Sequence, residues 1–186
     1  MFLLNELNAT QNQTRWWDQF PPRLRLIAKG RLWASIGAGG VLYLSPLLFN
    51  ELGFSASQIG TGITIAAIAG TISRLITGFF LDKGIRCNNP IKLAALFAIC
   101  ADLLLFNSYE FKQYLLGQIL LGAAAGIYWP SIELAVPIYC EKYPSSKGFA
   151  LVRTADALGI TLGAVLGTLW SSIGILRSIY LLDIFC

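Results

Sequence analysis

The 186-residue sequence contains no histidine, and charged residues make up only 13% of it. Its cysteines, Cys87, Cys100, Cys140 and Cys186, lack the short spacings that are typical of zinc or redox sites. No Walker-type loop is present, and the glycines that start at Gly37 follow no strand, so neither ATP hydrolysis nor dinucleotide binding is indicated. Serines without a histidine or a paired lysine form no nucleophilic constellation. We therefore expect neither an enzyme nor a metal or cofactor site.

Apolar residues take the place of the missing charges and account for 55% of the chain. Ordinary soluble domains carry about 25% charged residues, about twice the share found in this sequence. Several apolar stretches reach the roughly 20 residues that a helix needs to cross a hydrocarbon core about 30 Å thick. The strands of a membrane barrel would be shorter and would alternate in polarity. The sequence therefore predicts an all-α, polytopic helix bundle in a lipid bilayer.

The predicted organisation is a basic cytoplasmic lead-in over residues 1–31, followed by a transmembrane domain over residues 32–186. The lead-in lacks the charged start, apolar middle and small-residue cleavage site of a signal peptide. Five full spans and a partial sixth are expected. Twelve residues of helix rise only about 18 Å, so we expect the chain to be an incomplete part of a longer protein. The spans are residues 32–52, 58–81, 91–107, 113–140, 148–171 and, in part, 175–186.

The distribution of lysine and arginine predicts the orientation. With the N-terminus in the cytoplasm, ten bases lie on the cytoplasmic side and only Lys112 and Arg177 lie outside. Such a bias follows the positive-inside rule that sets membrane topology. The net charge of +4 therefore reports orientation, and no nucleic-acid partner is indicated.

A glycine, an acid and two bases separate the second and third expected spans. They are Gly78, Asp82, Lys83 and Arg86. This pattern resembles the loop between the second and third helices of the major facilitator superfamily. One element departs from the family pattern, because the second glycine, Gly84, comes one place early.

The resemblance covers the chain from about residue 31 to its end and implies twelve helices in two six-helix halves, each made of two inverted repeats. It implies secondary transport of a small solute by alternating access, with this chain as the amino-terminal half. The missing carboxy-terminal half or a second copy of the chain would be its partner. The alternative from another class is a non-transporting membrane protein, either a truncated remnant or a scaffold or regulatory subunit.

Other runs are similar to further family patterns. The stretches 128–133 and 150–159 look most like bacterial permeases, cyanobacterial ones among them, without a settled substrate, which implies a bacterial inner membrane. Gln118 stands where many family members carry an arginine linked to proton coupling, before Gly122 and Gly126. Ala164 replaces the proline of an antiporter pattern. Both departures count against those particular mechanisms.

Five charged residues lie well inside the five full expected spans: Arg74, Asp102, Glu133, Arg153 and Asp156. Counted by helix rise from the nearest cytoplasmic charge, all lie about 9–15 Å deep. A charge at that depth costs at least about 2.5–3.5 kcal/mol on insertion scales, so such residues normally face the protein interior. Glycines at helical spacing accompany four of them and mark faces where helices approach closely.

Three interpretations of Arg74, Glu133, Arg153 and Asp156 stay open. They form a structural layer of ion pairs, a cytoplasmic gate whose pairs break and re-form, or, through Arg74, a contact with an anionic solute. Asp102 has no evident partner in its own span. It is either neutral, because burial disfavours the charged form, or paired with a helix outside this sequence.

Aromatic residues near the middle of the membrane complete the candidates. Tyr43, Tyr128 and Trp129 lie beside prolines or glycines in the first and fourth spans. The resemblance implies that these two spans line the central cavity. Lining of the cavity and ordinary packing stay open for these three residues. Gln118 belongs to the same set of expected cavity residues.

Overall fold

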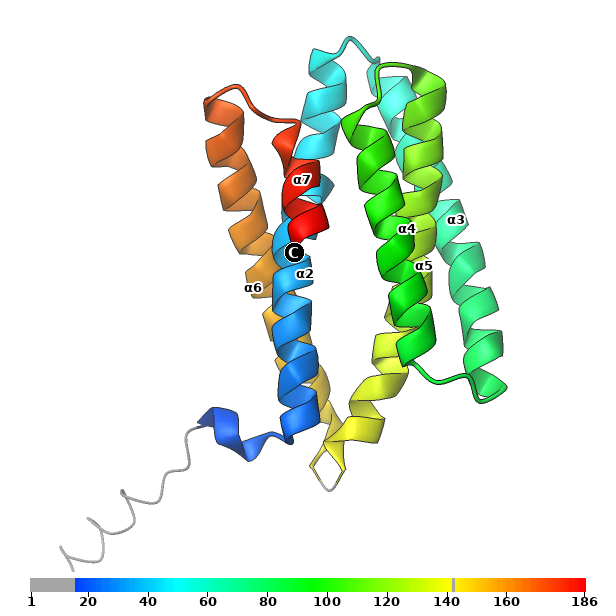
Figure 1. Ribbon diagram of the computed structural model, residues 1–186, viewed down its shortest axis with the longest axis vertical. Coiled ribbons are helices and arrows are strands. Elements are labelled where there is room, and N and C mark those ends of the chain that lie inside the picture. The colour runs from blue at the N-terminus through cyan, green and yellow to red at the C-terminus, as the bar shows by residue number, and fades with distance from the viewer. Residues whose placement is uncertain (1–15, 142) are drawn as a thin grey trace, which may run out of the picture.

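A computed structural model describes residues 16–141 and 143–186, and these ranges consist of helices joined by short turns, with no strand among them (Figure 1). This architecture confirms the predicted all-α class. The described part of the chain begins with a short 3-10 helix, η1 (Trp16–Gln19), and continues as six α-helices. These are α2 (Pro22–Glu51), α3 (Ala56–Asp82), α4 (Asn88–Phe106), α5 (Phe111–Cys140), α6 (Ser145–Ser172) and α7 (Ser178–Phe185).

Five of the helices, α2 to α6, are long and apolar enough to cross a membrane, in agreement with the five full spans that hydropathy predicts. The sixth expected span is present as the eight residues of α7. The first 15 residues of the predicted lead-in lie outside the described residues.

The first long helix begins earlier than expected. Its first residue is Pro22, a type that is favoured at the start of a helix because its fixed φ suits the helix and its missing N–H costs no bond there. Leu24 and Ala28 are buried in a core with Val136 and Leu151 of α5 and α6. The second part of the predicted lead-in is therefore the first turns of α2 and belongs to the bundle.

The turn after α3 carries the loop signature. The helix ends at Asp82, and Gly84 follows with a φ of +88°, a conformation that residues with a side chain rarely adopt. The Gly84 N–H donates to the carbonyl oxygen of Leu81 at 2.9 Å. Gly84, the glycine that comes one place early in the family pattern, therefore lies in the turn that terminates α3.

The bundle consists of two closely packed sets of helices. In one, α2 packs along α6; in the other, α5 packs against both α3 and α4 (Figure 1). Helix α7 contacts α2 and α4 in the upper half of the view and thereby joins the two sets. The turn at residues 83–87, the end of α5 and the start of α6 lie at the lower end with the start of α2 (Figure 1).

Glycines decide how closely the helices approach. A Cβ added at Gly122 would overlap the carbonyl group of Ala66, and one at Gly126 would overlap that of Gly70. On the other side, a Cβ at Gly163 would overlap the carbonyl oxygen of Ile36. The small-residue stripes therefore lie at the α3–α5 and α2–α6 contacts, as the sequence predicts.

Arg177 fastens the upper end of the bundle. Its guanidinium group donates to the carbonyl oxygen of Ser108 at 3.0 Å and to that of Phe106, and it lies 4.0 Å from the ring centre of Tyr109. This base, which the sequence assigns to an outer loop, connects the turn before α7 with the turn between α4 and α5.

The orientation of the chain in the membrane stays a prediction, and exposed positions at the two ends of the bundle can test it. Tyr109 is 69% exposed, whereas the neighbouring Ser108 is fully buried. In a chain whose four cysteines are replaced by serine, we expect a membrane-impermeant maleimide added to intact cells to label Tyr109→Cys. Ser146→Cys, which is exposed at the opposite end, should react only after the cells are opened. Labelling in the reverse pattern would contradict a cytoplasmic N-terminus.

Candidate functional site

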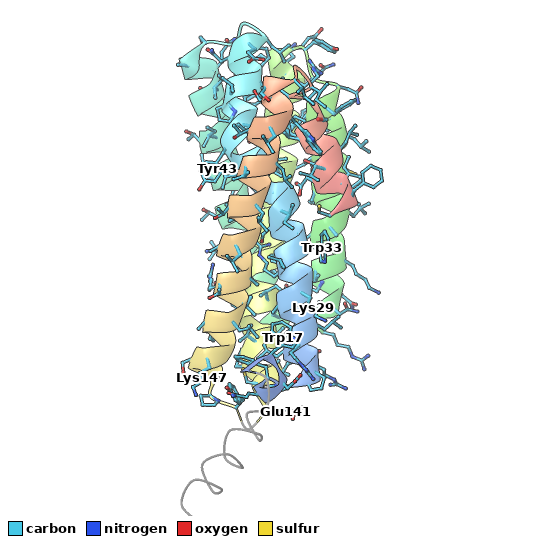
Figure 2. The ribbon with its side chains drawn as sticks, turned by 90° about the vertical axis from the view of Figure 1, so that its left-hand side faces the viewer. Trp17, Lys29, Trp33, Tyr43, Glu141 and Lys147 are labelled. Carbon is cyan, nitrogen blue, oxygen red and sulfur yellow. The ribbon has the colours of Figure 1, made fainter. Side chains whose placement is uncertain are left out.

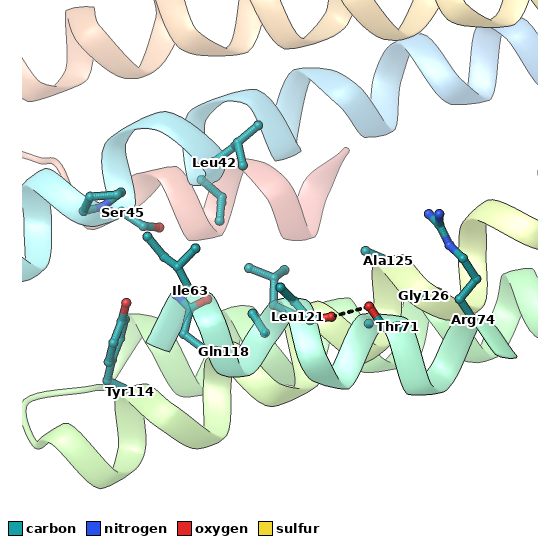
Figure 3. Close-up of a pocket in the computed structure, with 16 residues that line it drawn as sticks. Leu42, Ser45, Ile63, Thr71, Arg74, Tyr114, Gln118, Leu121, Ala125 and Gly126 are labelled. Atoms are coloured by element: carbon teal, nitrogen blue, oxygen red, sulfur yellow. Dashed lines mark hydrogen bonds between the residues drawn. The ribbon is translucent and has the colours of Figure 1, made fainter. Parts of the chain in front are cut away.

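A cavity of about 520 Å³ lies between α2, α3 and α5. Most of its wall is apolar or formed by small residues, and one polar or charged side chain stands at each end, Tyr114 and Arg74 (Figure 3). Gln118 lies between them on α5 (Figure 3). The glycines that draw α3 against α5, Gly70, Gly122 and Gly126, also line the cavity.

Three of the polar groups in the wall have partners within the protein. The Tyr114 hydroxyl donates to the carbonyl oxygen of Ile59 at 3.0 Å. The Thr71 hydroxyl donates to that of Ala67 at 2.9 Å (Figure 3). The hydroxyl of Ser45 shares a hydrogen bond of 2.7 Å with that of Tyr180. These groups are therefore already satisfied before any solute enters.

Arg74 and Gln118 differ from the other polar residues of the cavity. Arg74 is exposed, and Gln118 is buried with 6% of its surface exposed. Within the described part of the chain, the structure records no hydrogen bond or ion pair for either side chain. Their donor and acceptor groups remain available to a solute or to another protein segment.

Arg31 forms the best-protected ion pair of the described residues. Its guanidinium group contacts the carboxylate of Asp156 at 2.6 and 2.9 Å, and the side chains are only 11% and 12% exposed. The Ser35 hydroxyl donates to the same carboxylate oxygen at 2.7 Å. The guanidinium also lies 4.9 Å from the ring centre of Tyr128 and 4.6 Å from that of Trp129. We call these five residues the Arg31 cluster; it ties α2 to α5 and α6.

Glu133 and Arg153 form a separate pair at 3.1 Å, with side chains that are 46% and 54% exposed. Arg153 also lies 4.2 Å from the ring centre of Trp129. The four charges that the sequence places in one layer therefore divide into this exposed pair, the Arg31 cluster and the cavity wall. Asp156 pairs with Arg31 rather than with either base of the expected layer.

The remaining predicted residues lie away from these groups. Tyr43 is 61% exposed (Figure 2) and is not part of the cavity wall. Tyr128 and Trp129 are half-buried in the Arg31 cluster and also lie outside the wall. Asp82 is exposed at the end of α3 and makes no ion pair within the described residues. Lys83 lies over the ring of Phe79, 4.1 Å from its centre.

Of the other two residues of the loop signature, Gly78 is half-buried near the end of α3, and Arg86 is exposed in the turn that follows. Asp102 is buried on α4, where it contacts Asp183 of α7. In the part of the chain that the structure describes, no three histidine, cysteine, aspartate or glutamate side chains come together as metal ligands would.

Sequence reasoning missed Arg31, because the boundary of the lead-in was drawn at that residue. Two features of the sequence could have indicated Arg31. They are its distance along α2 from the small-residue stripe and the aromatic residues Tyr128 and Trp129. A base at the edge of a span can reach an acid in the bundle, because its long apolar stem carries the charged group several ångströms from the backbone.

The two ion pairs should differ in their contribution to stability. Replacing one partner of a buried pair leaves an uncompensated charge and costs about 3–5 kcal/mol, whereas an exposed pair contributes about 0–1 kcal/mol. We expect Arg31→Gln to lower the thermal stability of the detergent-purified protein far more than Arg153→Gln. The double variant Arg31→Gln with Asp156→Asn should lose less than the sum of the two single losses. Equal losses for both arginines, or strictly additive losses in the double variant, would contradict this assignment.

Comparison with known proteins agrees with the geometry. The family model described as Major Facilitator Superfamily matches residues 27–185, a range that starts inside α2 and ends in α7. The chain is 29% identical over 178 residues to YtbD of Bacillus subtilis strain 168, described as an uncharacterised MFS-type transporter. That alignment covers 86% of this chain and 43% of the relative, so the chain spans less than half the length of this relative. With five membrane-spanning helices and a family model that matches most of its length, the chain is an integral membrane protein that belongs to the Major Facilitator Superfamily.

Proposed function

We propose that the chain forms one half of a secondary transporter that moves a small solute by alternating access. The observation that carries this proposal is the cavity between α2, α3 and α5, whose wall contains two polar side chains without partners among the described residues. A buried amide and a cation beside an apolar wall are the groups that a solute would need to bind in the membrane. The name of the Bacillus subtilis relative, an MFS-type transporter, supports the same function.

The exposed surface of α3 supports the presence of a second half. Only 6% of the apolar stretch of this helix is buried, whereas the figure for the corresponding stretch of α5 is 44%. Large apolar side chains such as Ile72 and Leu75 are exposed along it. In proteins of this architecture the two halves rock against each other around the central site. We propose that a carboxy-terminal bundle, or a second copy of this chain, closes the open side of the cavity.

Arg74 indicates the chemistry of the solute. In an apolar cavity a guanidinium group binds a carboxylate, phosphate or sulfate group through charge-assisted hydrogen bonds. The Gln118 amide can donate to or accept from a second polar group of the same molecule. The apolar wall, which includes Val41, Ile63 and Leu121, suits a hydrocarbon portion. We therefore propose a small organic anion as the solute, and a bacterial inner membrane with a cytoplasmic N-terminus as its setting.

The test uses the natural gene product, with any residues that follow Cys186 included, in membrane vesicles from cells that overproduce it. Vesicles are supplied with labelled organic anions, sugars, amino acids and cationic dyes. We expect saturable uptake of at least one organic anion and a loss of roughly tenfold or more in Arg74→Gln, since one good charge-assisted contact is worth about 1.5–3 kcal/mol.

Leu96→Ala is the control, because Leu96 lies on α4, a helix that does not contribute to the cavity wall, and is 55% exposed. It should leave uptake unchanged. Uptake that Arg74→Gln does not affect would remove Arg74 from the solute site. The absence of saturable uptake of every compound would favour the non-transporting scaffold.

A further inference from the structure

Asp102 is a buried acid that lies outside the cavity wall. It lies on α4 with 1% of its surface exposed, and within the described residues its Oδ1 atom has no hydrogen-bond partner. Leaving a charged carboxylate unpaired in such a place costs several kcal/mol. The chain avoids this cost if the carboxyl group is neutral or if a cation compensates it.

The group that faces Asp102 is a second acid. The carboxyl of Asp183, on α7, interacts with that of Asp102 both electrostatically and as a side-chain hydrogen-bond neighbour. Ionised carboxylates only accept hydrogen bonds, so two of them can bond to each other only if one carries a proton. Like charges at such close range also disfavour each other's ionisation.

Among the residues that the structure describes, no base forms an ion pair with either acid. From α2, Arg31 acts on Asp183, but its guanidinium is already paired with Asp156. From α7, Tyr180 and Cys186 face the two acids, and both are uncharged when protonated. Helix α4 adds no other ionisable group beside Asp102, and Tyr114 of α5 acts on Tyr180 rather than on the acids.

A metal ion fits this place poorly. Cations such as Ca²⁺ and Mg²⁺ require about six or more oxygen ligands, and no third acidic, cysteine or histidine side chain joins the pair in the described part of the chain. The backbone of α2 also approaches too closely, because a Cβ added at Gly37 would overlap both the backbone and the carboxylate of Asp183. A proton needs no such space.

We propose that Asp102 and Asp183 form a proton-binding site between α4 and α7, in which the two carboxyl groups share one exchangeable proton. The proton enters from water and leaves to it, and its loss places two negative charges side by side where two helices meet. Asp183 is partly exposed, so the pair is not fully enclosed on its α7 side. This site goes beyond the transport function proposed above, and it exists whether or not that function is correct.

Infrared difference spectroscopy of the purified 186-residue chain in lipid tests the site, because the carbonyl stretch of a protonated carboxyl is distinct from that of a carboxylate. At neutral pH we expect one protonated carboxyl band that disappears reversibly on alkaline titration. Either Asp102→Asn or Asp183→Asn should abolish this band, since the new amide donates to the remaining acid and leaves it ionised.

Glu133→Gln is the control, because Glu133 is also an acid of the bundle but is paired with Arg153, on helices other than α4 and α7. It should leave the band unchanged. Absence of the band in the unmodified protein would overturn the proposal, and so would its persistence in Asp183→Asn, which would mean that Asp102 is neutral by itself. A band that sodium chloride removes at constant pH would point to a sodium site and would also overturn it.

Discussion

The absence of water from the hydrocarbon core is the constraint on which the structure depends. Backbone groups satisfy each other within helices, and threonine hydroxyls, such as those of Thr64 and Thr161, bond to the carbonyl oxygen four residues earlier in the same helix. Arg31 and Asp156 satisfy each other across two helices. Polar side chains in the bundle for which the described residues provide no partner, such as Arg74 and Gln118 in the cavity wall, are therefore informative about function.

Close packing at glycines then determines where the unsatisfied groups lie. The contact of Gly122 with Ala66 and of Gly126 with Gly70 brings α3 and α5 together along one edge, and the same glycines form part of the cavity wall. Larger residues at these positions would separate the helices and move Arg74 away from Gln118. The helix contacts and the cavity therefore have one physical origin, the uncovered backbone of small residues.

The fold was largely predictable from the sequence, and the pairing of side chains was not. Hydropathy and helix breakers place the spans and turns well, since each depends on a continuous segment of the chain. Depth along a helix is also a local property, so Glu133 and Arg153 are expected at similar levels. Which base meets Asp156 depends instead on the lateral arrangement of helices, and the close α2–α6 contact brings Arg31 to it. Tyr43 faces outward for the same reason, because the inward face of α2 is set by its glycines.

Helix α7 connects the acid pair with the cavity. Asp183 packs against Gly37, and one turn earlier Tyr180 shares a hydrogen bond with Ser45, a residue of the cavity wall. A change of charge between Asp102 and Asp183 would act on α7, and α7 is bonded to the wall of the proposed solute site. Coupling of this kind requires an element with two arrangements that both sites bias. The family pattern has an arginine linked to proton coupling at the position of Gln118, and this chain lacks it. The proposed acid pair would give the chain a proton-binding site elsewhere in the bundle.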